Sequence, residues 1–213
     1  MKYKVGFLID KKNSWIEKSI KKKFKKNNSK YLFLISRDKK TFNKFDILFI
    51  LGFTKILSSK FLSKNNLNLI VHESDLPKGK GLAPVQWQIL KNKNRIPITL
   101  FKANKEVDSG DIYLKDYFLI EKSDLDDEIR AKQSLSTIKI IKKFLKNYPK
   151  IQTRKQKGKS TYFKKRSPKD HKLNIKKSIK ENFNLLRISN NYKYPAYFNL
   201  YGKKYILKIF KDE

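Results

Sequence analysis

The chain has 213 residues, with 52 lysines and arginines against 19 aspartates and glutamates, and a formal net charge of +33. It has no cysteine, which excludes disulfides, thiolate metal sites and cysteine nucleophiles. No apolar run reaches the roughly 18–20 residues of a membrane-spanning helix. The amino-terminal run is too short and too soon interrupted for a signal peptide, so we expect a cytoplasmic protein without a membrane partner.

The positive charge has two explanations. The first is an attraction to nucleic acid, another anionic ligand or a membrane surface. The second is codon usage, because Lys, Asn, Ile, Phe and Tyr are all abundant and all have AT-rich codons. The lysines are spread along the whole length, and lysine outnumbers arginine, which is the better reader of phosphates and bases. We therefore favour codon usage, although the resulting field still attracts anions.

The first part of the chain alternates apolar runs with amphipathic stretches. Buried strands are predicted at residues 4–9, 31–36, 46–51 and 68–72, with helices at residues 14–26, capped by Ser14 and Glu17, and at residues 53–62. This order predicts an α/β fold with a mostly parallel sheet and helices on both faces. Ligands bind such sheets at the carboxyl ends of the strands, where Asp10, Gly52 and His72 fall. No G-x-G-x-x-G follows the first strand, so a standard dinucleotide site is not supported.

The second part continues with a helix at residues 82–90, strands at residues 96–101 and 111–120, and a long helix that Ser123 caps and Pro149 ends, with Leu135 inward. Residues 150–160 are basic and polar, and we predict a linker there. A helix at residues 174–189, with Ile175 and Ile179 on its inner stripe, and a hairpin at residues 195–210 complete the chain. We therefore divide it into a main domain, residues 1–150, and a linker with a small helix and hairpin extension, residues 151–213.

Few side chains are candidates for chemistry. His72 ends an apolar strand, where an imidazole that titrates near neutrality can meet a substrate, although a core or loop histidine with a satisfied hydrogen bond is the commoner case. The other histidine, His171, lies in a basic loop. With two histidines and no cysteine, a zinc site held by protein side chains alone is not expected.

Two glycine-bearing turns follow His72. LPKGKG supplies Gly79 and Gly81 for close backbone approach, and Lys78 and Lys80 as candidates for phosphate or carboxylate binding. A DSGD turn lies about thirty-five residues after the histidine and begins with Asp108. Such a turn is usually only a turn, but its carboxylate can orient an imidazole or accept a proton if it returns to the edge that holds His72.

Together these segments resemble the formyltransferase family, which includes methionyl-tRNA formyltransferases and sugar N-formyltransferases. HESDLPKGKGLAPVQWQIL, then ITLF and VDSGDIY, follow the family's order of histidine, serine, L-P-K, glycine-bearing loop, A-P, tryptophan-bearing helix and D-[ST]-G-D. The match covers residues 46–116, and ILGFTKIL resembles the preceding strand and helix.

The resemblance implies a Rossmann-like core that uses N10-formyltetrahydrofolate as its formyl donor. His72 takes the place of the family's catalytic histidine and Asp108 that of its catalytic aspartate. An uncharged primary amine would attack the formyl carbon, and the resulting oxyanion needs a hydrogen bond or positive charge. We predict folate contacts from the backbone of residues 51–53 (Leu51, Gly52, Phe53) and from Gly79 and Gly81. Acceptor contacts are predicted from Lys78, Lys80, Asp10 and Trp87.

One position departs from the family pattern. The family usually carries an asparagine two residues before the histidine, and here that residue is Ile70, which has no hydrogen-bond donor in its side chain. Either His72, a backbone N–H or Ser74 stabilises the oxyanion, or the chemistry is altered. A relative that binds folate or a nucleotide without turnover is therefore one alternative.

The acceptor predicted from the tail is a nucleotide-linked amino sugar destined for a glycan or surface polysaccharide. FKKRSPKDHKLN and YPAYFNLYGKKYIL look like the tail of short sugar formyltransferases, and one helix with a hairpin is too little for the carboxy-terminal barrel of methionyl-tRNA formyltransferases. The charge makes a charged tRNA the second candidate. An aromatic hairpin also suggests a homodimer.

Overall fold

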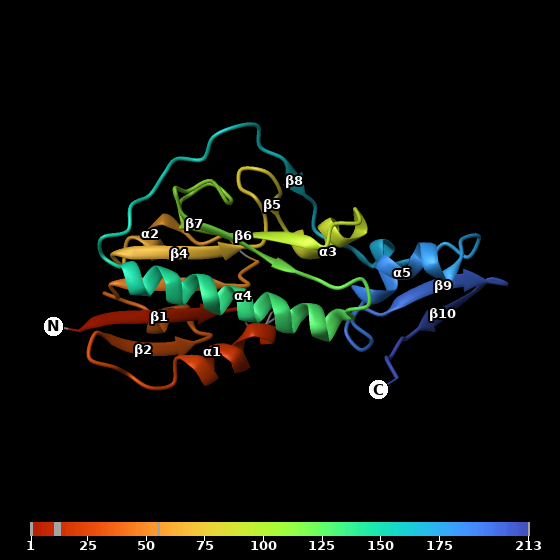
Figure 1. The fold of residues 1–213 in the computed structure, drawn as a ribbon, viewed down its shortest axis with the longest axis horizontal. Helices are drawn as coiled ribbons and strands as arrows, with labels where there is room; N and C mark the ends of the chain where they lie inside the picture. Colours follow the sequence, from red (N-terminus) through yellow and green to blue (C-terminus); the bar gives the residue numbers. More distant parts are fainter. Residues whose placement is uncertain (1, 11–13, 55, 213) are drawn as a thin grey trace.

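The computed structural model describes residues 2–10, 14–54 and 56–212, which form a six-stranded sheet flanked by helices and a smaller carboxy-terminal part (Figure 1). The strand order is β2-β1-β3-β4-β6-β7. The strands are β1 (Tyr3–Ile9), β2 (Tyr31–Ser36), β3 (Ile47–Leu51), β4 (Leu67–His72), β6 (Arg95–Lys102) and β7 (Ile112–Leu119). The first four run parallel, and β6 runs antiparallel to both β4 and β7. The predicted mostly parallel sheet is confirmed.

Both faces of the sheet are covered. On one face, the 3-10 helix η1 (Ser14–Ile16), α1 (Glu17–Lys23) and α4 (Asp126–Asn147) close over an apolar core that includes Phe7, Phe49 and Leu69. On the other face, the 3-10 helix η2 (Lys39–Thr41), α2 (Ser59–Leu62) and their loops cover Leu8, Leu48 and Ile50. Successive side chains of a strand point to opposite faces, so each central strand serves both cores and reads as a continuous apolar run.

Several helices differ from the sequence-based expectation at their ends. Only Ser59–Leu62 of the predicted 53–62 helix is helical among the described residues, because the Ser58 hydroxyl accepts the Phe61 N–H and starts the helix there. The long helix begins at Asp126 rather than at a Ser123 cap, and the Leu125 N–H donates to the Glu128 carboxylate at 2.8 Å. Leu135 is exposed, contrary to prediction. Apolar periodicity locates a helix well and its terminal turns poorly.

The predicted cap of Ser14 and Glu17 stays a prediction, and the structure shows other partners for the Glu17 carboxylate. This carboxylate accepts from the Arg37 guanidinium, at 2.8 Å from Nε, and pairs with Lys21 at 2.8 Å. These hydrogen bonds lower the pKa of Glu17, and the one from Arg37 has the larger effect. The side chain of Ser14, the other half of the predicted cap, lies outside the described residues.

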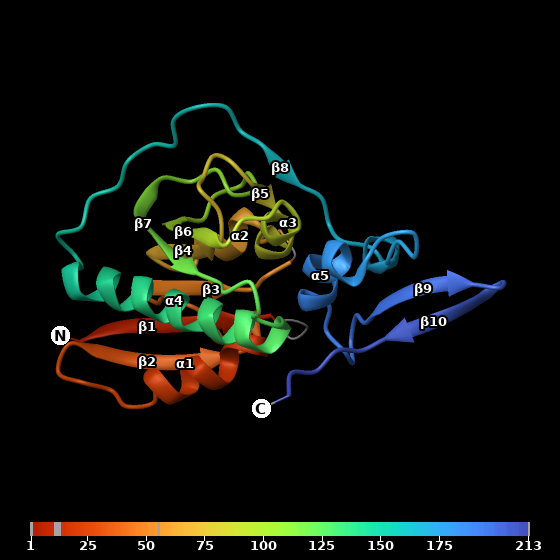
Figure 2. The same ribbon diagram turned by 45° about the vertical axis from the view of Figure 1, so that its right-hand side comes forward.

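The carboxy-terminal half wraps around the sheet. The short strand β5 (Lys80–Gly81) pairs with β8 (Tyr162–Phe163), and α3 (Pro84–Leu90) follows β5. Residues 151–163 arch over the β5 and β7 side of the molecule, as both ribbon views show (Figure 2). The 3-10 helix η3 (Pro168–His171), α5 (Ile179–Arg187), β9 (Ala196–Leu200) and β10 (Lys203–Leu207) then form the small part at one end. The hairpin is confirmed, and the division of the chain at residue 150 stays a prediction.

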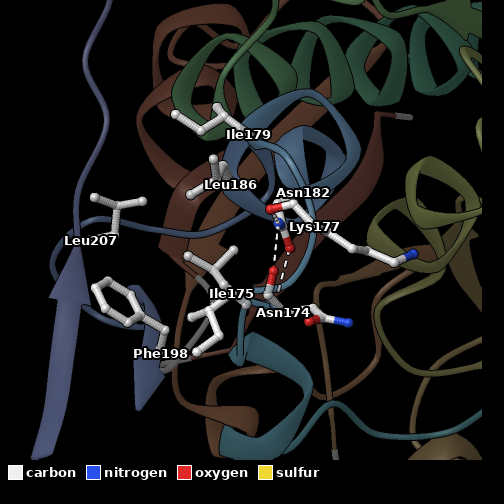
Figure 3. A pocket seen from close by; sticks show the side chains of 9 residues that line it. Asn174, Ile175, Lys177, Ile179, Asn182, Leu186, Phe198 and Leu207 are labelled. Atoms are coloured by element: carbon white, nitrogen blue, oxygen red, sulfur yellow. Dashed lines mark hydrogen bonds between the residues drawn. The ribbon is translucent and has the colours of Figure 1, made fainter. Parts of the chain in front are cut away.

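α5 is shorter than the predicted 174–189 helix, and both Ile175 and Ile179 are exposed. A groove of about 190 Å³ lies between this helix and the hairpin, and Ile179, Leu186, Phe198 and Leu207 line it (Figure 3). Within the described ranges of the chain, no helix combines the length and apolar character needed to cross a bilayer.

A buried arginine ties α5 to the main sheet. Arg187 is 1% exposed, and its guanidinium donates to the Glu121 carbonyl at 2.7 Å and to the Asn94 and Asn184 side-chain oxygens at 2.9 Å each. Burial lowers the pKa of Arg187. Such a charge is tolerated in the interior because its donors are satisfied by oxygen acceptors.

His171 is buried beside this part of the chain and should make stability depend on pH. Burial, followed by the charge of Arg166, lowers the pKa of His171 from 6.5 to about 4. Because the unfolded chain takes up the proton first, the contribution is fully present above pH 6.5 and is lost as the pH falls towards 4. We expect the free energy of unfolding, measured by urea titration at a series of pH values, to fall more steeply across that window in wild type than in His171→Gln. The difference between the two proteins should change by roughly 3 kcal/mol in total. Parallel pH profiles for the two proteins would contradict a neutral buried imidazole.

Candidate active site

His72 and Asp108, far apart in the sequence, lie beside each other. His72 ends β4, is 7% exposed, and its Nε2 lies 2.8 Å from the Gly79 carbonyl oxygen. A carbonyl oxygen can only accept, so Nε2 carries the hydrogen. The same Nε2 lies 3.8 Å from Asp108 Oδ2. The DSGD turn therefore returns to the edge of the sheet that holds His72.

Asp108 lies in the loop between β6 and β7 and has a left-handed backbone, with φ of +50°. Its Oδ2 accepts a hydrogen bond from the Gly81 N–H at 2.8 Å. Aspartate is among the few residues with a side chain that visit this conformation readily. The turn also presses on the sheet, because a Cβ on Gly110 would lie 1.6 Å from the Lys102 carbonyl oxygen. Only glycine fits there.

The loop after His72 supplies backbone groups to both catalytic candidates. Gly79 has φ of +75° and Gly81 has φ of +98°, so both adopt conformations that favour glycine. Lys80, between them, is 7% exposed, and its ammonium lies 5.8 Å from the centre of the Tyr162 ring. Lys78 is exposed at the rim.

The segment predicted as a linker completes the site. The Gln156 carboxamide donates to the carbonyl oxygens of Asp108 and Gly110, at 2.9 Å each. The Thr161 hydroxyl accepts the Gly79 N–H at 2.8 Å, and its carbonyl accepts the Lys80 N–H at 2.9 Å. Sequence reasoning missed both residues, because residues 150–163 carry no apolar periodicity and are dominated by lysine and arginine.

The position of the missing asparagine is apolar. Ile70 packs in a cluster with Leu76, Phe101 and Ile112. Ser74 is 2% exposed, and its hydroxyl oxygen is buried without a hydrogen-bond partner among the described residues. The candidate donors are therefore the Nε2–H of His72 and the unpaired hydroxyl of Ser74, two residues further along the chain. An unpaired buried hydroxyl is costly, which favours a polar ligand group at this place.

A second group of predicted residues gathers at the carboxyl ends of β1 and β3. Asp10 accepts from the Thr54 N–H at 3.1 Å and from its hydroxyl at 3.0 Å. Gly52 and His72 each follow by two residues the paired Ile50 and Ile70, so this backbone lies across from the histidine. The adjacent Leu51 is buried, and Phe53 packs on the second core.

Trp87, predicted as an acceptor contact, lies on α3 with its indole N–H donating to the Lys164 carbonyl at 2.8 Å. The Lys164 ammonium lies 5.4 Å from the Trp87 ring and pairs with Asp170 at 3.0 Å. The pKa of Asp170 is lowered to about 2, chiefly by the hydrogen bond from the Ser167 N–H and further by the one from the Lys164 ammonium. Trp87 thus joins α3 to the segment that leads into the carboxy-terminal part.

The α/β sheet of this chain, with a histidine and an aspartate beside each other at its carboxyl edge, has the formyltransferase fold. Residues 43–143 match the family described as Formyl transferase. The likeness to this enzyme family lies in that segment, which carries both His72 and Asp108.

Two curated relatives show how far the sequence likeness extends. Methionyl-tRNA formyltransferase of Caldicellulosiruptor saccharolyticus is 31% identical over 172 residues, which cover 79% of this chain and 54% of that protein. The bifunctional polymyxin resistance protein ArnA of Wigglesworthia glossinidia brevipalpis is 29% identical over 185 residues, covering 85% of this chain and 28% of that protein. The chain therefore spans about half, or less, of the length of these relatives.

Solved structures share the fold at lower identity. A methionyl-tRNA formyltransferase from Clostridium thermocellum has a TM-score of 0.84 at 20% identity, covering 99% of this chain and 94% of that one. A 4-N formyltransferase from Francisella tularensis has a TM-score of 0.71 at 17% identity, covering 99% and 98%. HypX from Aquifex aeolicus, in complex with tetrahydrofolic acid, has a TM-score of 0.73 at 15% identity, covering 96% and 37%.

The close approach of the Gly81 loop to residue 163 can be tested with two alanine substitutions. A Cβ on Gly81 would lie 2.3 Å from the Phe163 carbonyl oxygen, whereas one on Gly158 would meet nothing within 4 Å. The two glycines have nearly the same φ, +98° and +101°, so Gly158→Ala reports backbone strain alone. We expect Gly158→Ala to lower the free energy of unfolding by about 1 kcal/mol. Gly81→Ala should lower it by at least about 2 kcal/mol more than Gly158→Ala does. Equal losses in urea titrations would contradict the contact.

Proposed function

We propose that this protein transfers a formyl group from N10-formyltetrahydrofolate to a primary amine, in the cytoplasm. The observation that carries the proposal is the His72–Asp108 pair, 3.8 Å apart, within the segment that matches the formyltransferase family. Tetrahydrofolic acid bound to HypX, a protein of similar fold, supports a folate donor. When bound, this donor would supply the formyl group, and its nitrogen would stay with the tetrahydrofolate that leaves.

The residues divide the chemistry between them. The His72 Nε2–H, which now donates to the Gly79 carbonyl, is placed to donate to the oxygen of the formyl group as negative charge develops on it. The unpaired Ser74 hydroxyl is a second donor of the right kind at a position where Ile70 offers none. The Asp108 carboxylate, fixed by the Gly81 N–H, accepts a proton from the attacking amine. Transfer would form a C–N bond to the amine and break the one to the folate nitrogen, and the proton taken up by Asp108 would pass to that nitrogen.

The folate would lie against the backbone of residues 51–53 and of Gly79 and Gly81. The unpaired buried hydroxyl of Ser74 and the glycine backbone of this loop fit a flat, polar ring system, because backbone groups approach such a ring closely only where no side chain intervenes. Lys78, Lys80, Asp10 and Trp87 remain the proposed acceptor contacts.

The proposed acceptor is a nucleotide-linked amino sugar. The fold likeness to the Francisella 4-N formyltransferase runs through nearly the whole of both chains, including α5 and the hairpin. A homodimer is part of this proposal, because Tyr201 and Tyr205 of the hairpin are exposed aromatic side chains of the kind found at interfaces.

A charged initiator tRNA is the second candidate. The net charge of +33 suits a polyanion, and the TM-score of 0.84 to the Clostridium methionyl-tRNA formyltransferase favours it. A tRNA acceptor would make transfer strongly dependent on salt, since each phosphate contact releases counterions.

The two acceptors separate in one assay. Purified protein with N10-formyltetrahydrofolate is offered a panel of nucleotide 4-amino and 3-amino sugars, beside charged initiator tRNA. We expect one or more of the sugars to be formylated. Transfer to tRNA with none to sugar would replace the first candidate by the second, and transfer to neither would refute the formyltransferase proposal.

The catalytic assignment predicts unequal effects at the two histidines. His72→Gln and Asp108→Asn should each lower kcat by about 10²–10⁴-fold, the usual contribution of a positioned acid or base. His171→Gln is the matched control, because the other histidine of the chain lies outside this site, and it should keep wild-type kcat. A wild-type rate for His72→Gln would exclude the role given to that imidazole.

A further inference from the structure

We propose that residues 154–163, here called the clamp segment, hold the His72–Asp108 pair in its catalytic geometry, with Gln156 as a positioning residue. The proposal rests on the formyltransferase function above. The clamp segment forms hydrogen bonds with backbone groups around both residues of the pair. The segment acts through the two loops that hold them.

The first contact fixes the Asp108 turn. The Gln156 Nε2 group donates both of its hydrogens, to the Asp108 and Gly110 carbonyl oxygens, at 2.9 Å each. Two residues earlier, the Arg154 backbone exchanges hydrogen bonds with Ile112 at 2.8 and 2.9 Å. On its other side the turn presses against the Lys102 carbonyl. The turn is therefore held between β6 and the clamp segment, with the left-handed Asp108 in the middle.

The second contact fixes the loop beside His72. Thr161 receives the Gly79 N–H on its hydroxyl and the Lys80 N–H on its carbonyl, at 2.8 and 2.9 Å. The Phe163 carbonyl receives the Leu82 N–H at 3.2 Å. This same loop accepts from His72 through the Gly79 carbonyl and donates to Asp108 through the Gly81 N–H.

The clamp segment therefore helps to set the distance between His72 Nε2 and Asp108 Oδ2, which no direct hydrogen bond sets. At 3.8 Å, His72 Nε2 and Asp108 Oδ2 lie beyond hydrogen-bond range, so no hydrogen bond between the two side chains fixes their separation. Each is instead fixed by a loop, and one stretch of backbone holds both loops. A misplacement of about 1 Å costs on the order of 10²-fold in rate.

Gln156→Met tests the positioning role, because methionine keeps the length of the side chain and removes the donors. Gln152→Met is the matched control, an exposed glutamine of the same region. We expect Gln156→Met to lower kcat ten- to a hundred-fold, with KM for donor and acceptor within about threefold of wild type. Gln152→Met should match wild type in both. A kcat for Gln156→Met equal to that of the control would overturn the proposal.

Hydrogen exchange at the Gly81 amide provides a readout that needs no turnover. This N–H is bonded to the Asp108 carboxylate, so its protection reports where that carboxylate lies. We expect protection to fall in Gln156→Met towards the level of Asp108→Ala, while thermal unfolding stays near the control. Unchanged protection, even with a lower kcat, would overturn the positioning role. Absent transfer by wild type would defeat the proposed function, and the exchange measurement would still decide the clamp.

Discussion

The hydrogen bond from the Gly81 N–H to the Asp108 carboxylate is the link on which the site depends. It joins two loops that are distant in sequence, and both of its ends require a left-handed backbone, at φ of +98° and +50°. A carboxylate that accepts a backbone N–H makes a charge-assisted bond, which is shorter and stronger than a neutral one. The bond fixes the direction of the Asp108 carboxylate, and with it the space that an amine and a formyl group would share with His72.

The sheet supplies the support for those loops. His72 pairs with Thr99 across the antiparallel β4–β6 contact, and the Thr99 hydroxyl donates to the Ser74 carbonyl at 2.6 Å. Leu76, Phe101 and Ile112, which lie near the bases of the loops, pack together with Ile70. Ile70 therefore has a packing role where the family pattern has a polar residue. In the proposed site, the donors are the His72 imidazole and the Ser74 hydroxyl rather than residue 70 of β4.

The carboxy-terminal part shows where local pattern and tertiary contact diverge. The hairpin is predicted well because two short runs with aromatic and large apolar residues flank the Tyr201–Gly202 turn. The predicted inner stripe of α5 fails at Ile175 and Ile179, since the helix begins only after Ser178, whose hydroxyl accepts the Glu181 N–H. Arg187, which reads as a surface charge, is instead the deepest attachment of this helix, because oxygen acceptors from residues 94, 121 and 184 converge on it.

By itself the sequence determined the parallel core of the sheet, the long helix, the hairpin and the identity of His72 and Asp108. The strands are predictable because a continuous apolar run is expected of a strand buried on both faces. His72 and Asp108 are predictable because a histidine followed by a glycine-bearing loop and a DSGD turn is a specific sequence pattern. Only the tertiary structure decided that residues 154–163 complete the site. Gln156 and Thr161 each make two hydrogen bonds to backbone groups 46 to 82 residues away, and such bonds leave no periodicity in a lysine-rich sequence. Their role depends on which carbonyl and amide the fold places opposite them, and that is a property of the assembled chain.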